Sequence, residues 1–167
     1  MLEYAGGPEA VEKYVRGLGI ENTFISASEK TMHDRIENQY LNRSTPTATA
    51  RLIETFFENR LFASKYKKFL IRIMTETSTG QDKLKGLLPP DCTVGHKTGS
   101  SDRTSTGVKI ADNDAGFVLT PDGKRYYIAV FVSDSQEDDP TNASIIARIS
   151  AIVYDFMIRP TDPNRPT

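Results

Sequence analysis

The sequence predicts an α/β (α+β) fold in which antiparallel strands are packed by helices. Three segments before residue 75 and one after residue 139 carry apolar residues at helical spacing, whereas residues 93–133 carry strand-like apolar runs separated by turn residues. The 167 residues have the length of one ordinary domain, and a hydrophobic content of 38% is enough for a core. Helices and strands are therefore expected in separate parts of the chain.

The first helix is expected over residues 8–18, where Pro8 suits a first helical turn and Gly19 suits a stop. The segment that follows, residues 21–44, is polar and has no sustained period. It is also longer than most connections within a compact domain. We interpret it as a functional loop.

Two further helices are expected, one beginning at Thr45-Pro46 and one at Ser64. Each carries apolar residues on one face, such as Leu52 and Ile53 in the earlier of the two. Thr45 and Ser64 are interpreted as caps, because a hydroxyl can accept a hydrogen bond from an N–H group of the first helical turn.

Three strands are expected, over residues 93–99, 116–120 and 126–133. The last two are joined by a hairpin at residues 120–123, with Pro121 set for the second turn position. Residues 126–132 are apolar on both faces, which predicts a central strand with neighbours on either side. Only one neighbour is obvious, and an apolar strand at an edge is an aggregation hazard, so we expect strands from outside this sequence beside it.

A terminal helix is expected to open at Asp139-Pro140, with a Pro-rich, frayed tail over residues 160–167. The chain is thus divided into a helical region over residues 1–90, which includes the loop of residues 21–44, and a sheet region with the last helix over residues 91–159.

Composition excludes several kinds of partner and cofactor. The 21 basic and 22 acidic residues give no global field for nucleic acid or an anionic membrane. The single cysteine, Cys92, forms no internal disulfide, and His33 and His96 lack the spacing of a zinc site, so no metal or cofactor is expected. We find no apolar run long enough to span a membrane and no export signal after Met1.

The triplet Lys97-Thr98-Gly99, followed by Ser100, ends the first expected strand. A strand along a cleft can offer backbone N–H groups to an oxyanion, while an ammonium holds a carboxylate and a hydroxyl adds a hydrogen bond. Three common residues also recur by chance, and the alternative is a solvated lysine before a turn glycine. The other motifs decide between the two.

Several motifs occur together in an order that resembles class A serine β-lactamases, over nearly the whole chain. The resemblance is closest to the extended-spectrum and Bacteroides-type cephalosporinases, and it predicts a part of the β-lactamase/transpeptidase-like fold. The segments that carry it are Ala27-Ser28-Glu29-Lys30-Thr31-Met32-His33, residues 76–80, residues 84–89, Gly95-His96-Lys97-Thr98-Gly99-Ser100, Asn113-Asp114 and Pro121-Asp122-Gly123.

The resemblance implies roles for particular residues. Glu29 matches the loop glutamate that deprotonates the water which clears the acyl-enzyme. Lys97, Thr98 and Gly99 match the substrate-binding strand, and Ser100 falls where a backbone N–H completes the oxyanion hole. His33 stands where many members have an asparagine that helps to hold the water, although a structural or solvent-exposed role is at least as compatible with the sequence.

The sequence departs from the family in two places. Ala27 stands where many members have an arginine that holds the loop by an ion pair, so we expect packing around Met32 and Tyr40 to hold it instead. Residues 101–114 form a long connection between strands that could widen or gate the cleft. Arg103 in this connection could meet a substrate carboxylate, but we interpret it as solvated.

The nucleophile of the family is not found. Ser64-Lys65-Tyr66-Lys67 satisfies Ser-x-x-Lys formally, but it falls where the resemblance expects a surface helix, and we interpret it as a chance match to the pattern. No Ser-Asp-Asn exists, because Ser101-Asp102-Arg103 and Ser133-Asp134-Ser135 both differ at the third residue. The chain therefore corresponds to the C-terminal part of the family, and the partner expected is a segment with Ser-x-x-Lys and Ser-Asp-Asn.

Three functions remain open from sequence. The first is β-lactam hydrolysis, by a periplasmic or secreted full-length protein of which this chain alone is inactive. The second is a non-catalytic remnant that binds a partner or a β-lactam-like ligand without turnover. The third, an esterase or peptidase that uses Ser64, is disfavoured because neither histidine has a recognisable acid partner by motif.

Overall fold

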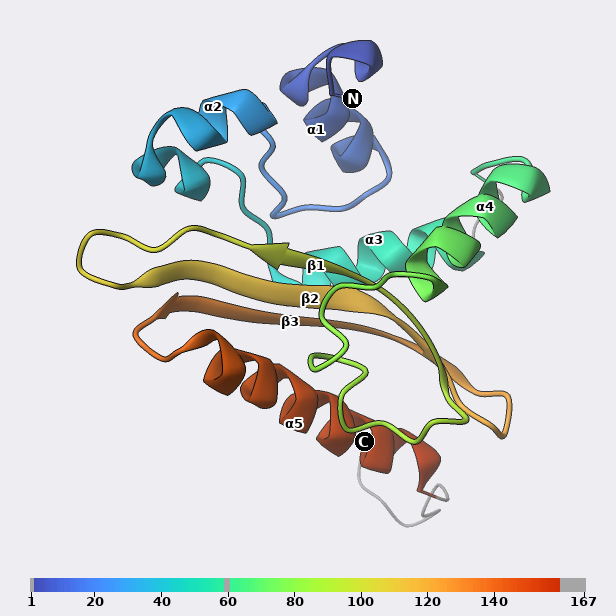
Figure 1. Cartoon of the computed structure of the whole chain (residues 1–167). Helices are drawn as coiled ribbons and strands as arrows, with labels where there is room; N and C mark the ends of the chain where they lie inside the picture. The colour runs from blue at the N-terminus through green and yellow to red at the C-terminus, as the bar shows by residue number, and fades with distance from the viewer. Residues whose placement is uncertain (1, 59–60, 160–167) are drawn as a thin grey trace, which may run out of the picture.

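A computed structural model of the chain describes residues 2–58 and 61–159, so the expected tail over residues 160–167 lies outside the described residues. Helices come first in the chain and the sheet follows, with one long helix at the end (Figure 1). The elements are η1 (Leu2–Ala5), α1 (Pro8–Gly17), α2 (Glu29–Asp34), η2 (Ile36–Tyr40), α3 (Pro46–Glu58), α4 (Ser64–Thr75), β1 (Thr93–Ser100), β2 (Lys109–Leu119), β3 (Arg125–Ser135) and α5 (Asp139–Ile158).

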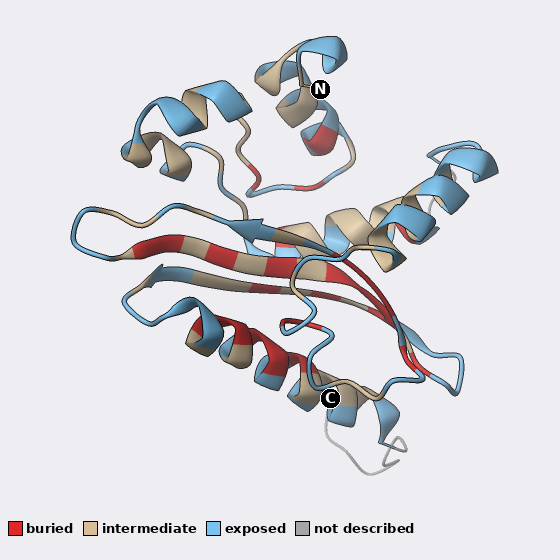
Figure 2. Cartoon of the chain, viewed as in Figure 1, coloured by how far each residue is buried: buried red, intermediate tan, exposed pale blue. Residues whose placement is uncertain are grey.

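The sheet is antiparallel, in the order β1-β2-β3. Helix α5 lies along one face of it and α3 along the other (Figure 1). Neighbouring residues of β2 serve the two faces: Phe117 packs against Phe57 of α3, with ring centroids 4.4 Å apart and ring planes tilted by 56°, whereas Val118 belongs to the core cluster that includes Ile146 of α5. Figure 2 shows the buried residues concentrated on β2 and on the side of α5 that faces the sheet.

Within the described sheet β2 lies between β1 and β3, and the strands from outside this sequence that we expect beside residues 126–132 remain a prediction. Strand β3 pairs with β2 and has no second partner among the described residues. Its alternate residues are nevertheless buried on the α5 side, where Ile128 and Val130 join the core. The apolar run is explained by helices that cover both faces of the sheet.

The strand expected over residues 116–120 is longer in the structure, where it is β2. The strand begins at Lys109 instead of residue 116, and the connection after β1 shrinks to residues 101–108. Sequence patterning misses residues 109–115 because two of the buried positions are carboxylates: Asp112 and Asp114 are 2% and 0% exposed. A strand whose inward residues are acidic does not show the apolar alternation that predicts strands.

Those two carboxylates are the centre of a buried polar cluster between the sheet and the turn-rich segment before β1. Lys83 Nζ pairs with Asp112, and Nδ1 of His96 lies 2.8 Å from Oδ2 of Asp114. Asp114 also accepts from the backbone N–H of Leu84 at 3.2 Å. Because each buried charge has a partner, the cluster ties β1 and β2 to the turn that carries Lys83 and Leu84.

The helix termini agree with the sequence at three places and disagree at one. Thr45 caps α3 by accepting from the N–H of Ala48 at 3.1 Å. Pro8 begins α1 and Asp139 begins α5, as expected, and Asp138, which the sequence analysis does not name, caps α5 by accepting from Thr141 N–H at 2.8 Å. The predicted cap at Ser64 is wrong, since the extended cap residue is Ala63 and no side chain caps α4. Ser64 is already in the helix, and a cap must be non-helical.

Helix α5, with 20 residues, is long and apolar enough by length and composition to cross a membrane, which the sequence analysis did not find. One face of this helix is buried against the sheet, at Ile146, Ala147 and Ser150. The Ser150 hydroxyl donates to the carbonyl of Leu84 at 2.7 Å, so α5 is held to the same turn as the buried cluster. Burial of one face accounts for part of its apolar character.

We predict that Asp114→Ala lowers the free energy of unfolding by about 3–5 kcal/mol, because it leaves His96 and the Leu84 N–H buried without their acceptor. Urea unfolding followed by circular dichroism measures this. Glu54→Ala, which removes an exposed carboxylate on α3, is the control and should change stability by less than about 0.5 kcal/mol. Equal effects of the two substitutions would contradict the structural role of Asp114.

Candidate active site

A pocket of about 290 Å³ lies between the segment of α2 and η2 and the adjoining ends of β1 and β2. It brings together four of the six candidate residues from sequence: Glu29, His33, Gly99 and Ser100 all line it. The other two, Lys97 and Thr98, belong to the same strand but do not line this pocket. The pocket therefore joins two segments that are about 70 residues apart in the chain.

Glu29 and His33 stand one turn apart on α2. The helix begins because Ser28 is extended and its hydroxyl accepts from the N–H of Thr31 at 3.2 Å. The cap places Glu29 at the first helical position, with His33 Nε2 lying 3.4 Å from Glu29 Oε1. Both side chains are largely exposed, 81% for Glu29 and 65% for His33. A carboxylate with this access to solvent can bind and orient a water molecule.

Strand β1 is flanked by the segment after α4. The hydroxyl of Thr77 donates to the carbonyl of His96 at 3.1 Å, and the hydroxyls of Thr79 and Thr98 are 3.0 Å apart. Gly80 is required at this contact, because it has φ +64° and a Cβ there would lie 2.4 Å from the Thr98 methyl. The exposed Lys97 donates to the carbonyl of Thr98. These contacts fix the backbone on which Gly99 and Ser100 stand.

The loop is held by Asn42, a residue that the sequence analysis did not single out. Its Oδ1 accepts from the N–H groups of Ser26 at 2.9 Å and Ala27 at 3.0 Å, and its Nδ2 donates to the carbonyl of Ala27 at 2.9 Å. Nδ2 also lies 3.3 Å from the sulfur of Met32. An amide can donate and accept at once, so one side chain closes the loop between residues 26 and 42.

The expectation that packing around Met32 and Tyr40 holds the loop is thus incomplete, because Asn42 also holds it. Met32 accepts from Asn42, and the Tyr40 hydroxyl donates to the carboxylate of Asp134 on β3. This carboxylate, as acceptor of the hydrogen bond, raises the pKa of the Tyr40 phenol. No spacing in the sequence indicates Asn42, because its partners are defined only when the loop has closed.

Arg103 does not line the pocket, and it differs from the free, solvated arginine that we expect, because its partly exposed guanidinium is bound on several sides. Its guanidinium donates to the carbonyls of Gly107 and Glu137, each at 2.9 Å, and pairs with Asp139 at the start of α5. The hydrogen bond from Arg103 holds the pKa of the Asp139 carboxyl below its usual range. Arg103 thus fixes the β1–β2 connection to the N-terminus of α5.

Ser64 is exposed at the start of α4 and does not line the pocket. His96 does have an acid partner in space, Asp114, which the sequence did not reveal, but the imidazole is 1% exposed in the core. A buried imidazole cannot serve an exposed hydroxyl, so this arrangement gives no triad with Ser64. Over residues 2–58 and 61–159, no three metal-ligating side chains gather into a metal site.

Comparison with known proteins gives consistent matches. A model of the β-lactamase enzyme family matches residues 1–157. The chain is 52% identical over 158 residues to a β-lactamase of Bacteroides uniformis, covering 94% of this chain and 53% of the relative. It is 37% identical over 159 residues to the extended-spectrum β-lactamase PER-1 of Pseudomonas aeruginosa, covering 95% of this chain and 51% of the relative.

A solved structure of a class A β-lactamase from Bacteroides cellulosilyticus is similar with a TM-score of 0.89 and 56% identity, over 93% of this chain and 56% of that one. The chain thus spans about half the length of the relatives that it matches. The fold class expected from sequence, antiparallel strands packed by helices in a part of this fold, is confirmed.

We predict that Asn42→Ala loosens the loop, so that the amides of Ser26 and Ala27 exchange hydrogen about 30-fold faster, which corresponds to about 2 kcal/mol of local stability. Hydrogen exchange resolved by residue measures this. Asn42→Asp is the matched control, because a carboxylate keeps the two accepted bonds and loses the donated ones, and it should give an intermediate increase. Unchanged exchange in Asn42→Ala would show that other contacts hold the loop.

Proposed function

The chain belongs to the class A β-lactamases, and from this premise we propose that the whole protein hydrolyses β-lactams through a serine acyl-enzyme. This chain contributes the deacylating carboxylate of Glu29 and the strand Lys97-Thr98-Gly99. The observation that carries the proposal is the pocket in which Glu29 and His33 face Gly99 and Ser100. Because these four residues share one cavity, they can act on the same bound substrate.

Each residue has a defined task in this proposal. Glu29 takes a proton from a water molecule, which attacks the acyl carbonyl, and the ester bond to the serine then breaks as the serine oxygen regains a proton; His33 at 3.4 Å supports the carboxylate. The backbone N–H of Ser100 stabilises the oxyanion that forms. The ammonium of Lys97 and the hydroxyl of Thr98 hold the carboxylate of the substrate. No metal or cofactor takes part in these steps.

The nucleophilic serine is proposed to come from the part of the whole protein that this chain lacks. Because the relatives are about twice as long, a segment of comparable size lies outside the match. We propose that this segment carries Ser-x-x-Lys and Ser-Asp-Asn, and that the whole protein acts in the periplasm or outside the cell. The helical region over residues 1–90 and the sheet region over residues 91–159 are proposed to form the two walls of the cleft.

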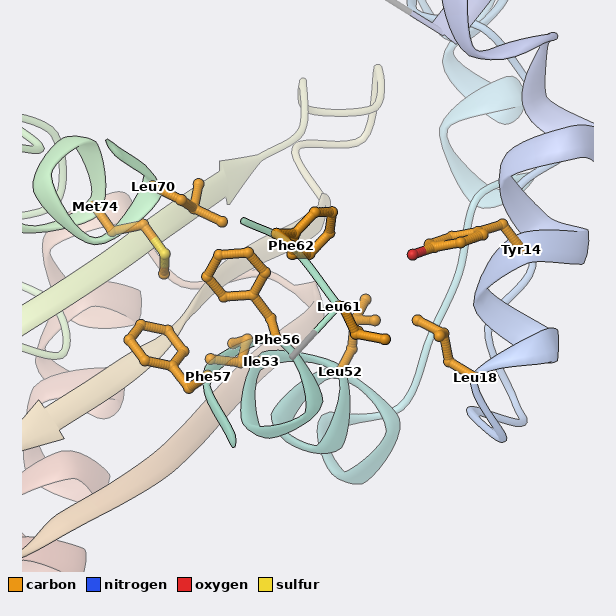
Figure 3. Close-up of a pocket in the computed structure, with 10 residues that line it drawn as sticks. All are labelled: Tyr14, Leu18, Leu52, Ile53, Phe56, Phe57, Leu61, Phe62, Leu70 and Met74. Carbon is orange, nitrogen blue, oxygen red and sulfur yellow. The ribbon is translucent and has the colours of Figure 1, made fainter. Parts of the chain in front are cut away.

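Two exposed apolar surfaces support the proposal that the whole protein contains such a segment. The first is a pocket of about 220 Å³ among α1, α3, α4 and the residues before α4 (Figure 3). Leu18, Leu52 and Phe56 project into it, and the hydroxyl of Tyr14 is the polar group that Figure 3 shows there. An apolar hollow of this size open to water lowers stability unless something fills it, so an apolar segment of the whole protein is the proposed occupant.

The second surface is the far edge of β3 together with the outer face of α5. Within the described residues β3 pairs on one side alone. On α5 the exposed fractions are 38% for Ile145, 39% for Ile149 and 68% for Ile152, a stripe at helical spacing. Further strands and a helix from the missing segment would cover this edge and this stripe.

A second candidate function is a non-catalytic remnant that binds β-lactam-like ligands. The observation in its favour is that Ser100 and Ser101 line the pocket together with Glu29, whereas no lysine is among the residues that line it. A hydroxyl without a base is a weak nucleophile. The two candidates differ in whether turnover appears when the missing segment is supplied.

We predict that the purified chain does not hydrolyse nitrocefin, and that hydrolysis appears on mixing with the part of the Bacteroides uniformis β-lactamase that this chain does not match. The measurement is the absorbance of the opened product. A Ser64→Ala variant is the control and should behave as the unmodified chain does. Hydrolysis by the chain alone that Ser64→Ala abolishes would establish Ser64 as the nucleophile, and none in any mixture would favour the remnant.

In the reconstituted protein, we predict that Glu29→Gln lowers turnover by about 100- to 10,000-fold while acylation proceeds, because the amide cannot accept the proton of the water. Intact-protein mass spectrometry should then show a persistent acyl adduct on the complementary segment. Glu37→Gln, an exposed carboxylate on η2, is the matched control and should leave turnover unchanged. A Glu29→Gln protein that deacylates normally would remove Glu29 from the mechanism.

A further inference from the structure

The face of α5 that points away from the sheet combines an apolar stripe with two charges of opposite sign. The stripe is made of Ile145, Ile149 and Ile152, all of them exposed. Its spacing of four residues and then three is the heptad spacing of the seam between two helices in a coiled coil. Arg148 and Asp155 are exposed as well, and because they are one heptad apart they lie on the same flank of the stripe.

Neither of these two charges is used within the described part of the chain. Over residues 2–58 and 61–159, the side chains of Arg148 and Asp155 form no hydrogen bond and no ion pair. Other arginines of the sheet region, Arg103 and Arg125, are each paired with a carboxylate. The outer face of α5 therefore offers an apolar seam together with an unpaired cation and an unpaired anion.

Two copies of α5 packed antiparallel would bring these charges together twice. In a two-fold symmetric contact, residue i of one copy meets residue j of the other, and j meets i. With the axis midway between positions 148 and 155, Arg148 of each copy lies beside Asp155 of the other copy. The axis then passes next to Ile152, which at 68% exposed is the most accessible of the three isoleucines. The face is thus complementary to itself in charge and in apolar pattern.

We propose that this chain forms a homodimer in which α5 packs antiparallel against α5 of a second copy. The stripe is buried at the centre of the contact, and the two Arg148–Asp155 pairs flank it. The contact uses the same patch on both copies, so it closes at the dimer. One helix face buries less than the roughly 800 Å² per partner of a standard interface, so the dimer is weak, with a Kd on the order of 10 µM.

A second copy is the occupant that the charges favour, because one helix supplies both complementary groups in the register that the seam requires. The missing segment proposed above would cover the same stripe in the whole protein, so the two assemblies exclude each other. The homodimer is therefore the state of this chain when that segment is absent.

Sedimentation equilibrium of the purified chain over a series of concentrations measures the dimer. In Arg148→Glu the flank of each copy becomes wholly acidic, so both attractive pairs become repulsive, and we expect Kd to rise about 30-fold. Asp155→Arg makes the flank wholly basic and should raise Kd by a similar factor. Glu54→Lys reverses an exposed charge on α3, on the opposite face of the sheet. It is the matched control and should leave Kd unchanged.

An equimolar mixture of the two charge-reversed variants tests the reciprocal pairing. The acidic flank of Arg148→Glu then meets the basic flank of Asp155→Arg at both ends of the contact. The mixture should therefore form heterodimers, with a Kd within about threefold of that of the unmodified chain. This recovery would also show that both variants are folded, because each is the partner of the other.

Several results would overturn the proposal. One is a chain that stays monomeric up to about 500 µM, and another is association that neither reversal weakens, which would place the contact elsewhere, such as the edge of β3. Weakening without recovery in the mixture would exclude the reciprocal pairs. A monomeric chain that associates only with the part of the Bacteroides uniformis β-lactamase it does not match would reserve the stripe for the missing segment. None of these results bears on the hydrolysis proposed above.

Discussion

The pair of buried carboxylates on β2 is the constraint on which the rest of the molecule depends. Asp112 and Asp114 are placed on the inner face of the sheet, where an ionised group is tolerated only with partners. Lys83, His96 and the N–H of Leu84 supply them. The partners come from the turn before β1 and from β1 itself, so the carboxylates determine how these segments sit against β2.

The geometry of the candidate site follows from that constraint. Because His96 is bound to Asp114 in the core, the residues that follow it, Lys97 to Ser100, are directed along the edge of the sheet toward the pocket. The opposite wall has an anchor of its own, since Asn42 closes the loop that carries Glu29 by hydrogen bonds to residues of that loop. Two independently fixed walls need a connection between them, and Gln39 with Asp102 provides one.

The same architecture explains why apolar surface remains exposed. The chain matches about half the length of its relatives and keeps their fold with a TM-score of 0.89, so under the proposal above it keeps the faces that would meet the other half. The hollow among α1, α3 and α4 and the outer stripe of α5 are both apolar. Their interpretation as contact surfaces follows from the hydrophobic effect and from the unmatched length of the relatives.

By itself the sequence determined the fold class, the three strands, the longer helices and the family, because these depend on periodic apolar patterns and on residues close together in the chain. It did not determine the extent of β2, the two short helices inside the loop of residues 21–44, or the clamp by Asn42. Buried carboxylates hide strand periodicity, a helix of six residues is too short to show one, and a side-chain clamp is defined by partners distant in sequence. Only the tertiary structure could bring Glu29 and Ser100 to one pocket, since their proximity depends on loop closure and strand pairing together.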